Sequence, residues 1–408
     1  MSNQGVIEQS DGELRQLIEA GEELVGYIYP HTPLELVLAH GLTPSLIRAV
    51  PGVPSGYEAS LQTFACSYVR NLFSLRADEQ MPQLAAILFP SNTCDSLQNV
   101  GDLWRIRFPN DRVLRLTYPV SFGGEREQAA VEFLAQELRL LSERLETLLN
   151  RRFSQDSFER AVSLVTHFRN AAGFLYAARA ADPHILPYAD LARLTRSFLT
   201  TPTGSILAEL DDVVDGVRFS LEKNGFLSVT EEIQDALSYR DVPSTKIEPK
   251  GQSPRVLVAG GMVEPESVGA LVNGIPDTSD SIIATDLLSF GFKSVFTHNV
   301  QLADDPFHEM AKSILSAPGE PTQEGLRGRM DFLSDLVRFL KIDGVILFEQ
   351  SFCDPDQFEA PSIERSCRNS GVRTTRVPID PELSDRARME VRIQSFLESI
   401  GEEGGGSG

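Results

Sequence analysis

Two segments far apart in the chain share one pattern. Residues 87–95 read ILFPSNTCD, and residues 346–354 read ILFEQSFCD. Each has an apolar run typical of a buried strand, four loop residues and then Cys-Asp, and we expect helices to start at Ser96 and near Pro361. In an open parallel sheet, ligands bind beyond the carboxyl ends of the strands. The repeat therefore predicts two similar α/β domains in which Cys94 and Cys353 hold equivalent ligand positions, and the two thiols converge if these domains face each other.

The rest of the chain fits this plan. The apolar patterning and the turn residues predict strands at 85–89, 112–118, 255–259, 281–285, 344–348 and 372–377, and a final helix at 383–400. Leucines at helical spacing after residue 125 predict a helical region with its leucine face in the core. We expect a first α/β domain at 20–124, a helical region at 125–240, a linker at 241–254, a second α/β domain at 255–400 and a flexible tail at 401–408. The predicted fold class is α/β, with two similar parallel-sheet domains facing each other and a helical segment between them.

The net charge and the lengths of the apolar runs indicate which kinds of partner the protein can bind. The 58 acidic and 37 basic side chains give a net charge of −21, which disfavours binding to nucleic acid. The first twenty residues lack a basic stretch followed by an apolar run, so no signal peptide is predicted. Apolar runs such as 84–89 are too short to span a bilayer. We expect a cytoplasmic protein that contacts neither nucleic acid nor membrane.

The cysteines carry the clearest chemical signal. Four cysteines without a CxxC pair argue against a disulfide framework and against a local zinc ribbon. Cys66 lies in LQTFACSYVRNLF, a segment with helical spacing in which Arg70 follows one turn later and would favour a thiolate. Cys367 lies on an amphipathic helix and is interpreted as an ordinary thiol. Cys66, Cys94 and Cys353 could together hold zinc or an iron–sulfur cluster, and the residues alone leave both open.

Four segments, in this order, resemble the ATP-activated 2-hydroxyacyl-CoA dehydratases and the related class I benzoyl-CoA reductases. They are GYIYPHTPLELVLAHGLTP, FACSYVR, FPSNTCDSLQNVGDLW and FEQSFCDP. The resemblance implies that Cys66, Cys94 and Cys353 ligate a [4Fe-4S] cluster between the two α/β domains and leave one iron open. It also implies a homologous second subunit, a separate ATP-hydrolysing iron–sulfur activator protein and a CoA-thioester substrate that receives single electrons at low potential. Dehydration and ring reduction both remain open.

His31 is the candidate catalytic residue, as a proton donor near the cluster. A structural, hydrogen-bonded histidine is the competing interpretation. Glu35 fits the P-x-E-L segment of the resemblance, and a carboxylate is also favourable in the first turn of a helix. Two other functions stay open for the whole chain: a non-catalytic electron-transfer subunit that feeds a homologous catalytic chain, and a zinc-stabilised binding protein. A relative with a double-cubane cluster would need more cysteine ligands than this chain has.

Overall fold

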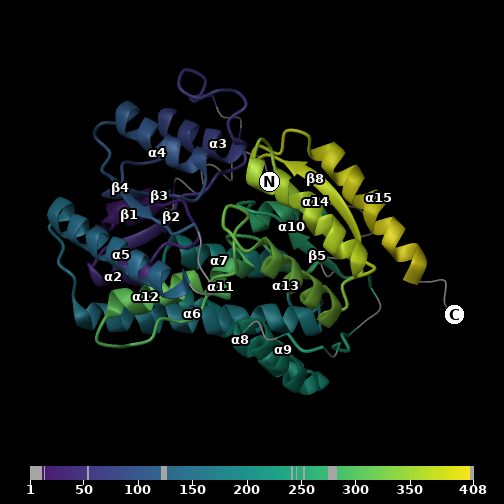
Figure 1. Cartoon of the computed structure of the whole chain (residues 1–408). Helices are drawn as coiled ribbons and strands as arrows, with labels where there is room; N and C mark the ends of the chain where they lie inside the picture. The colour runs from purple at the N-terminus through teal and green to yellow at the C-terminus, as the bar shows by residue number, and fades with distance from the viewer. Residues whose placement is uncertain are drawn as a thin grey trace.

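The computed structural model describes residues 12, 14–52, 55–120, 126–239, 242–244, 246–250, 253–273 and 283–404. Parts of the expected linker (241, 245, 251 and 252), of the strand expected at 281–285 (281 and 282) and of the expected tail (405–408) lie outside the described residues. Figure 1 shows two β-sheets side by side, with the long helix α6 running beneath both.

The first sheet is built from four parallel strands in the order β2-β1-β3-β4. The strands are β1 (Leu24–Tyr27), β2 (Thr43–Leu46), β3 (Ala86–Ser91) and β4 (Val113–Thr117). Helices α2 (Leu34–Ala39), α3 (Ser67–Ala77) and α4 (Asp95–Arg107) connect them. Every residue of β3 is buried, as expected for a parallel strand covered on both faces.

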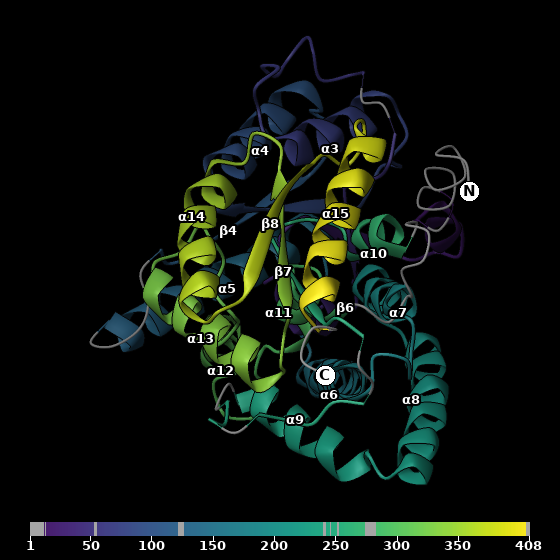
Figure 2. The ribbon, with the colours of Figure 1, turned by 90° about the vertical axis from the view of Figure 1, so that its right-hand side faces the viewer.

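The second sheet repeats this order as β6-β5-β7-β8, again with parallel pairs. Its strands are β5 (Val256–Ala259), β6 (Ile283–Leu287), β7 (Gly344–Gln350) and β8 (Arg373–Ile379). Its helices are α10 (Pro265–Asn273), α11 (Phe292–Val295), α12 (Pro306–Leu315), α13 (Leu326–Phe339), α14 (Asp354–Asn369) and α15 (Arg386–Gly404). Helices α14 and α15 flank β7 and β8 in Figure 2. The predicted α/β class with two parallel-sheet domains is confirmed.

Five helices lie between the two sheets in sequence: α5 (Glu127–Leu149), α6 (Gln155–Ala181), α7 (Tyr188–Thr200), α8 (Gly204–Asn224) and α9 (Leu227–Tyr239). The leucine face of α5 is buried at Leu134, Leu138, Leu141 and Leu145. Helix α6 packs on α2 of the first domain and on α11 and β6 of the second. Because one long helix touches both domains, it fixes how they face each other.

Several helix ends differ from the expectation, and α15 begins at Arg386 instead of 383. Helix α14 begins at Asp354, directly after Cys353, and Pro361 lies inside it. Proline inside a helix removes one backbone hydrogen bond, and its ring clashes with the carbonyl four residues earlier; burial of Ala360 and Ile363 on the same helix helps to offset this cost. Helix α15 continues to Gly404, past the expected start of the tail at residue 401. In the described part of the chain, no helix combines the length and the apolar character needed to cross a bilayer.

Candidate functional site

Each of three cysteines stands at the N-cap of a helix. Cys66 precedes α3, Cys94 precedes α4 and Cys353 precedes α14. The first backbone N–H groups of a helix lack partners within it and carry partial positive charge. The Sγ of Cys94 accepts a hydrogen bond from the backbone N–H of Leu97 at 3.4 Å. Three helix N-termini therefore present N–H donors at the three thiols, an arrangement that favours a negatively charged occupant.

The three thiols line one cavity of about 550 Å³, which we call the cysteine cavity. Cys94 and Cys353 follow β3 and β7, which occupy the same place in the two sheets. Cys66 comes from the first domain, and its thiol is hydrogen-bonded to that of Cys353 from the second. The backbone N–H of Ser67 donates to the carbonyl of Ser351 at 3.0 Å, and Gln350 Nε2 donates to Ser67 Oγ at 2.6 Å. The cavity is thus formed between the two domains.

The thiols differ in acidity. A hydrogen bond from Cys353 lowers the pKa of the Cys66 thiol. The same contact, together with burial, raises the pKa of Cys353, and burial raises the pKa of Cys94 to about 12. Binding of a metal or cluster to such thiols would displace their protons. Cys367 is buried within α14, is absent from the lining of the cysteine cavity, and has a pKa raised to about 12 by burial.

The cysteine cavity offers thiol and carboxyl side chains as ligands for a metal or a cluster. Within the described ranges, no three His, Cys, Asp or Glu side chains converge closely enough to hold a single metal ion. Thiolates ligate both zinc and iron–sulfur clusters. The Thr93 hydroxyl is buried in the cavity wall and finds no hydrogen-bond partner among the described residues. A polar occupant of the cavity or a water molecule would satisfy this hydroxyl.

Arg70 lies beside this site. Its guanidinium stands 5.2 Å from the ring centroid of Tyr57 and 5.4 Å from that of Phe352, and it donates to the Tyr57 hydroxyl at 3.2 Å. Phe352 precedes Cys353 and lines the cavity. The positive charge expected near Cys66 therefore lies over the rings at the edge of the cavity.

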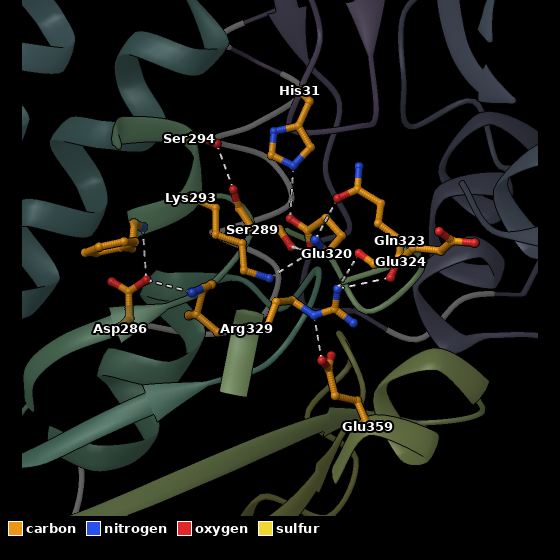
Figure 3. Close-up of polar contacts among 12 residues, drawn as sticks. His31, Asp286, Ser289, Lys293, Ser294, Glu320, Gln323, Glu324, Arg329 and Glu359 are labelled. Carbon is orange, nitrogen blue, oxygen red and sulfur yellow. Dashed lines mark hydrogen bonds and ion pairs between the residues drawn. The ribbon is translucent and has the colours of Figure 1, made fainter. Parts of the chain in front are cut away.

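His31 does not line the cysteine cavity. It is buried, and its Nε2 lies 3.3 Å from Oε1 of Glu320. Figure 3 shows the imidazole pointing toward this carboxylate, which also contacts Lys293. Burial alone would raise the pKa of Glu320, but Lys293 and His31 together lower it to about 2. The structure therefore places the candidate proton donor in a buried charged cluster next to the site.

Glu320 anchors the loop that joins α12 to α13. It accepts hydrogen bonds from Lys293 Nζ at 2.8 Å and from Ser289 Oγ at 3.0 Å. At the other end of the loop, Arg329 Nη1 donates to the carbonyls of Gln323 and Glu324, both at 3.0 Å. The middle of the loop, which supplies Pro321, Thr322 and Gln323, forms one wall of the cysteine cavity. We call residues 317–325 the wall loop.

Sequence reasoning missed Glu320, Lys293 and Arg329. The run APGEPTQEG at 317–325 carries the proline and glycine that mark a loop. Nothing in that run indicates which distant residues it covers.

The fold and the site together define a two-domain α/β protein that presents three thiols, from both domains, to one cavity. The family described as 2-hydroxyglutaryl-CoA dehydratase, D-component matches residues 30–400, and the chain belongs to this family. It is an enzyme subunit from a family whose members act on CoA thioesters.

Characterised relatives match over nearly their whole length. The beta subunit of lactoyl-CoA dehydratase from Anaerotignum propionicum is 24% identical over 396 residues, which cover 94% of this chain and 93% of that protein. The (R)-phenyllactyl-CoA dehydratase beta subunit of Clostridium sporogenes is 20% identical, and the match covers 95% of this chain and 94% of that protein. One of the subunits of benzoyl-CoA reductase from Thauera aromatica is 24% identical, and the match covers 88% of this chain and 86% of that protein. Because each of these relatives is named as one subunit of its enzyme, a partner subunit is implied for this chain.

Proposed function

We propose that this chain holds one [4Fe-4S] cluster on Cys66, Cys94 and Cys353 and serves the dehydration or reduction of CoA thioesters. The observation that carries the proposal is the meeting of three helix-capping thiols from two domains at one cavity. When bound, such a cluster would supply single electrons and one iron without a protein ligand.

The surrounding residues would have three tasks. The N–H groups at the starts of α3, α4 and α14 would stabilise the negative charge of the ligand set. The wall loop would keep bulk water from one side of the cavity. The contact of His31 with Glu320 would hold the imidazole in place and keep its Nε2 turned toward the carboxylate. In this arrangement His31 acts on the site through Glu320 and the wall loop.

Exposed aromatic residues at the cysteine cavity support the proposal of a partner subunit. Phe352 and Phe358 line the cavity, and they are 50% and 82% exposed. Exposed aromatic side chains at a functional opening are typical of a surface that a partner covers. We propose a homologous partner subunit there and a separate ATP-hydrolysing activator that supplies the electrons.

Anaerobic purification followed by iron, sulfide and zinc analysis tests the cluster. We expect about four irons and four sulfides per chain, the content of one [4Fe-4S] cluster. One zinc per chain without sulfide would refute the cluster and favour the alternative of a zinc-stabilised binding protein.

A second measurement separates a catalytic role from an electron relay. Acyl-CoA is added to the reduced protein and the electron paramagnetic resonance signal is recorded. A substrate that approaches the cluster perturbs this signal, whereas an unchanged signal with every thioester favours the non-catalytic electron-transfer role.

A further inference from the structure

A second cavity, of about 590 Å³, lies within the second domain. We call it the α13–α14 cavity. It opens beyond the ends of β5 and β6, where Ala259, Gly260 and Leu287 line it, and this end of a parallel sheet is the usual place for a ligand. Most of its lining is apolar, chiefly Leu287, Met330, Phe332, Leu333, Leu347 and Ile363. Its size suits a small organic group.

Both cationic side chains of this cavity are already paired with carboxylates, and its other charged side chains are acidic. Its two cationic lining residues are Lys293, 2.8 Å from Glu320, and Arg329, 2.7 Å from Glu359. Figure 3 shows both ion pairs. The lining carries four carboxylic side chains: Glu324, Asp335, Asp356 and Glu359. A ligand carboxylate here would therefore lack a free cationic partner among the described lining residues, and a buried unpaired charge is costly.

The α13–α14 cavity adjoins the cysteine cavity. Pro321, Arg329 and Glu359 line both. Arg329 joins the two walls, because it donates to the wall loop and to Glu359 on α14. These three residues therefore form a wall that the two cavities share.

We propose that the α13–α14 cavity binds the acyl part of the substrate, and that this acyl part is apolar and uncharged. The inference rests on the proposed function for the thioester, but the binding site is defined by residues other than the three cysteines. An aliphatic or aromatic acyl group would bury its surface against α13 and α14. A dicarboxylic acyl group would bind weakly, because its free carboxylate would lack a cationic partner in this cavity.

Binding is tested with two truncated thioesters, S-hexanoyl-N-acetylcysteamine and S-glutaryl-N-acetylcysteamine, by anaerobic titration calorimetry on the purified chain with its bound cofactor. We expect the hexanoyl probe to bind at least about tenfold more tightly, because burial of the unpaired glutaryl carboxylate is costly. Equal affinities, or no binding of the hexanoyl probe, would overturn the inference.

A helix glycine allows the cavity to be filled without disturbing the core. Gly328 on α13 lines the cavity, and a Cβ added there meets no atom within 4 Å. Gly328→Phe should weaken binding of the hexanoyl probe about tenfold by occupying the space it needs. Gly216 on α8 has the same open surroundings but lies outside the cavity, so Gly216→Phe is the matched control and should bind normally. Normal binding by Gly328→Phe would contradict the assignment.

Iron and sulfide are measured in the same samples. A wild-type chain that binds the hexanoyl probe selectively but carries no cluster would keep the acyl site and refute the proposed function. A chain that carries the cluster but binds both probes alike would keep the proposed function and refute the acyl site.

Discussion

Gln350 Nε2 lies 2.6 Å from Ser67 Oγ, so the last residue of β7 is joined to the first residue of α3. Ser67 follows Cys66, and Gln350 lies shortly before Cys353. This contact, with the backbone bond from Ser67 to Ser351, holds two cysteines of different domains at one cavity. Both partners are buried, so their hydrogen bond is shielded from water.

A double-mutant cycle tests this contact. Ser67→Ala, Gln350→Ala and the double variant are compared by urea unfolding. We expect the two substitutions to be non-additive by about 1 kcal/mol, because each removes the same buried hydrogen bond. Strict additivity would show that the contact does not join the domains.

Replacement of single cysteines should separate ligands from an ordinary thiol. Cys94→Ala should abolish bound iron, because only two thiols would remain at the cysteine cavity. Cys367→Ala is the control, since Cys367 is buried on α14 away from the cavity lining, and it should keep full iron at a stability cost of about 1 kcal/mol. Iron content and urea unfolding are the measurements. Equal loss of iron in both variants would refute the ligand assignment.

The wall loop should respond to pH through Glu320. Its pKa is about 2 in the folded protein, against about 4.3 for an ordinary glutamate. A carboxyl group whose pKa is lower in the folded than in the unfolded state stabilises the protein at pH values above the unfolded-state pKa. This stabilisation is lost as the pH falls toward 2, the pKa in the folded protein. Lys293, His31 and Ser289 face this carboxylate.

Glu320→Gln should therefore be less stable than wild type at pH 6, and the gap should narrow as the pH falls from about 4.3 toward about 2. Chemical unfolding at several pH values provides the measurement. Glu324→Gln changes an exposed residue of the same loop and should show no such pattern. A gap that stays constant with pH would mean that the Glu320 charge does not stabilise the loop.

Arg329 should hold the wall loop in place. Its side chain donates to two loop carbonyls and to Glu359. Arg329→Ala should lower the free energy of unfolding by about 2 kcal/mol and speed amide hydrogen exchange in residues 317–325. Arg327 on the same helix has a side chain that is 96% exposed, and its ion pair with Asp331 spans 3.9 Å. Arg327→Ala should leave both quantities unchanged, and equal exchange in the two variants would contradict the role of Arg329.

The sequence by itself determined the class of fold and pointed to the three cysteines. Alternating apolar runs and helical spacings are local patterns, and the repeated ILF-x4-CD segment identifies equivalent strand ends in two parallel sheets. The helix start near Pro361 was wrong because the capping position at Cys353 begins α14 earlier. The roles of the three cysteines as cluster ligands and of His31 as a proton donor stay predictions.

Only the tertiary structure decided which residues meet. It brought Cys66 beside Cys353, turned His31 toward Glu320 and laid the wall loop across the cysteine cavity. It also formed the α13–α14 cavity from strands and helices of the second domain. These contacts join residues far apart in the chain, and they depend on how α6 and the helices around it pack the two domains together. Local sequence patterns carry no record of such packing, because they indicate which face of a segment is apolar and not which distant element covers that face.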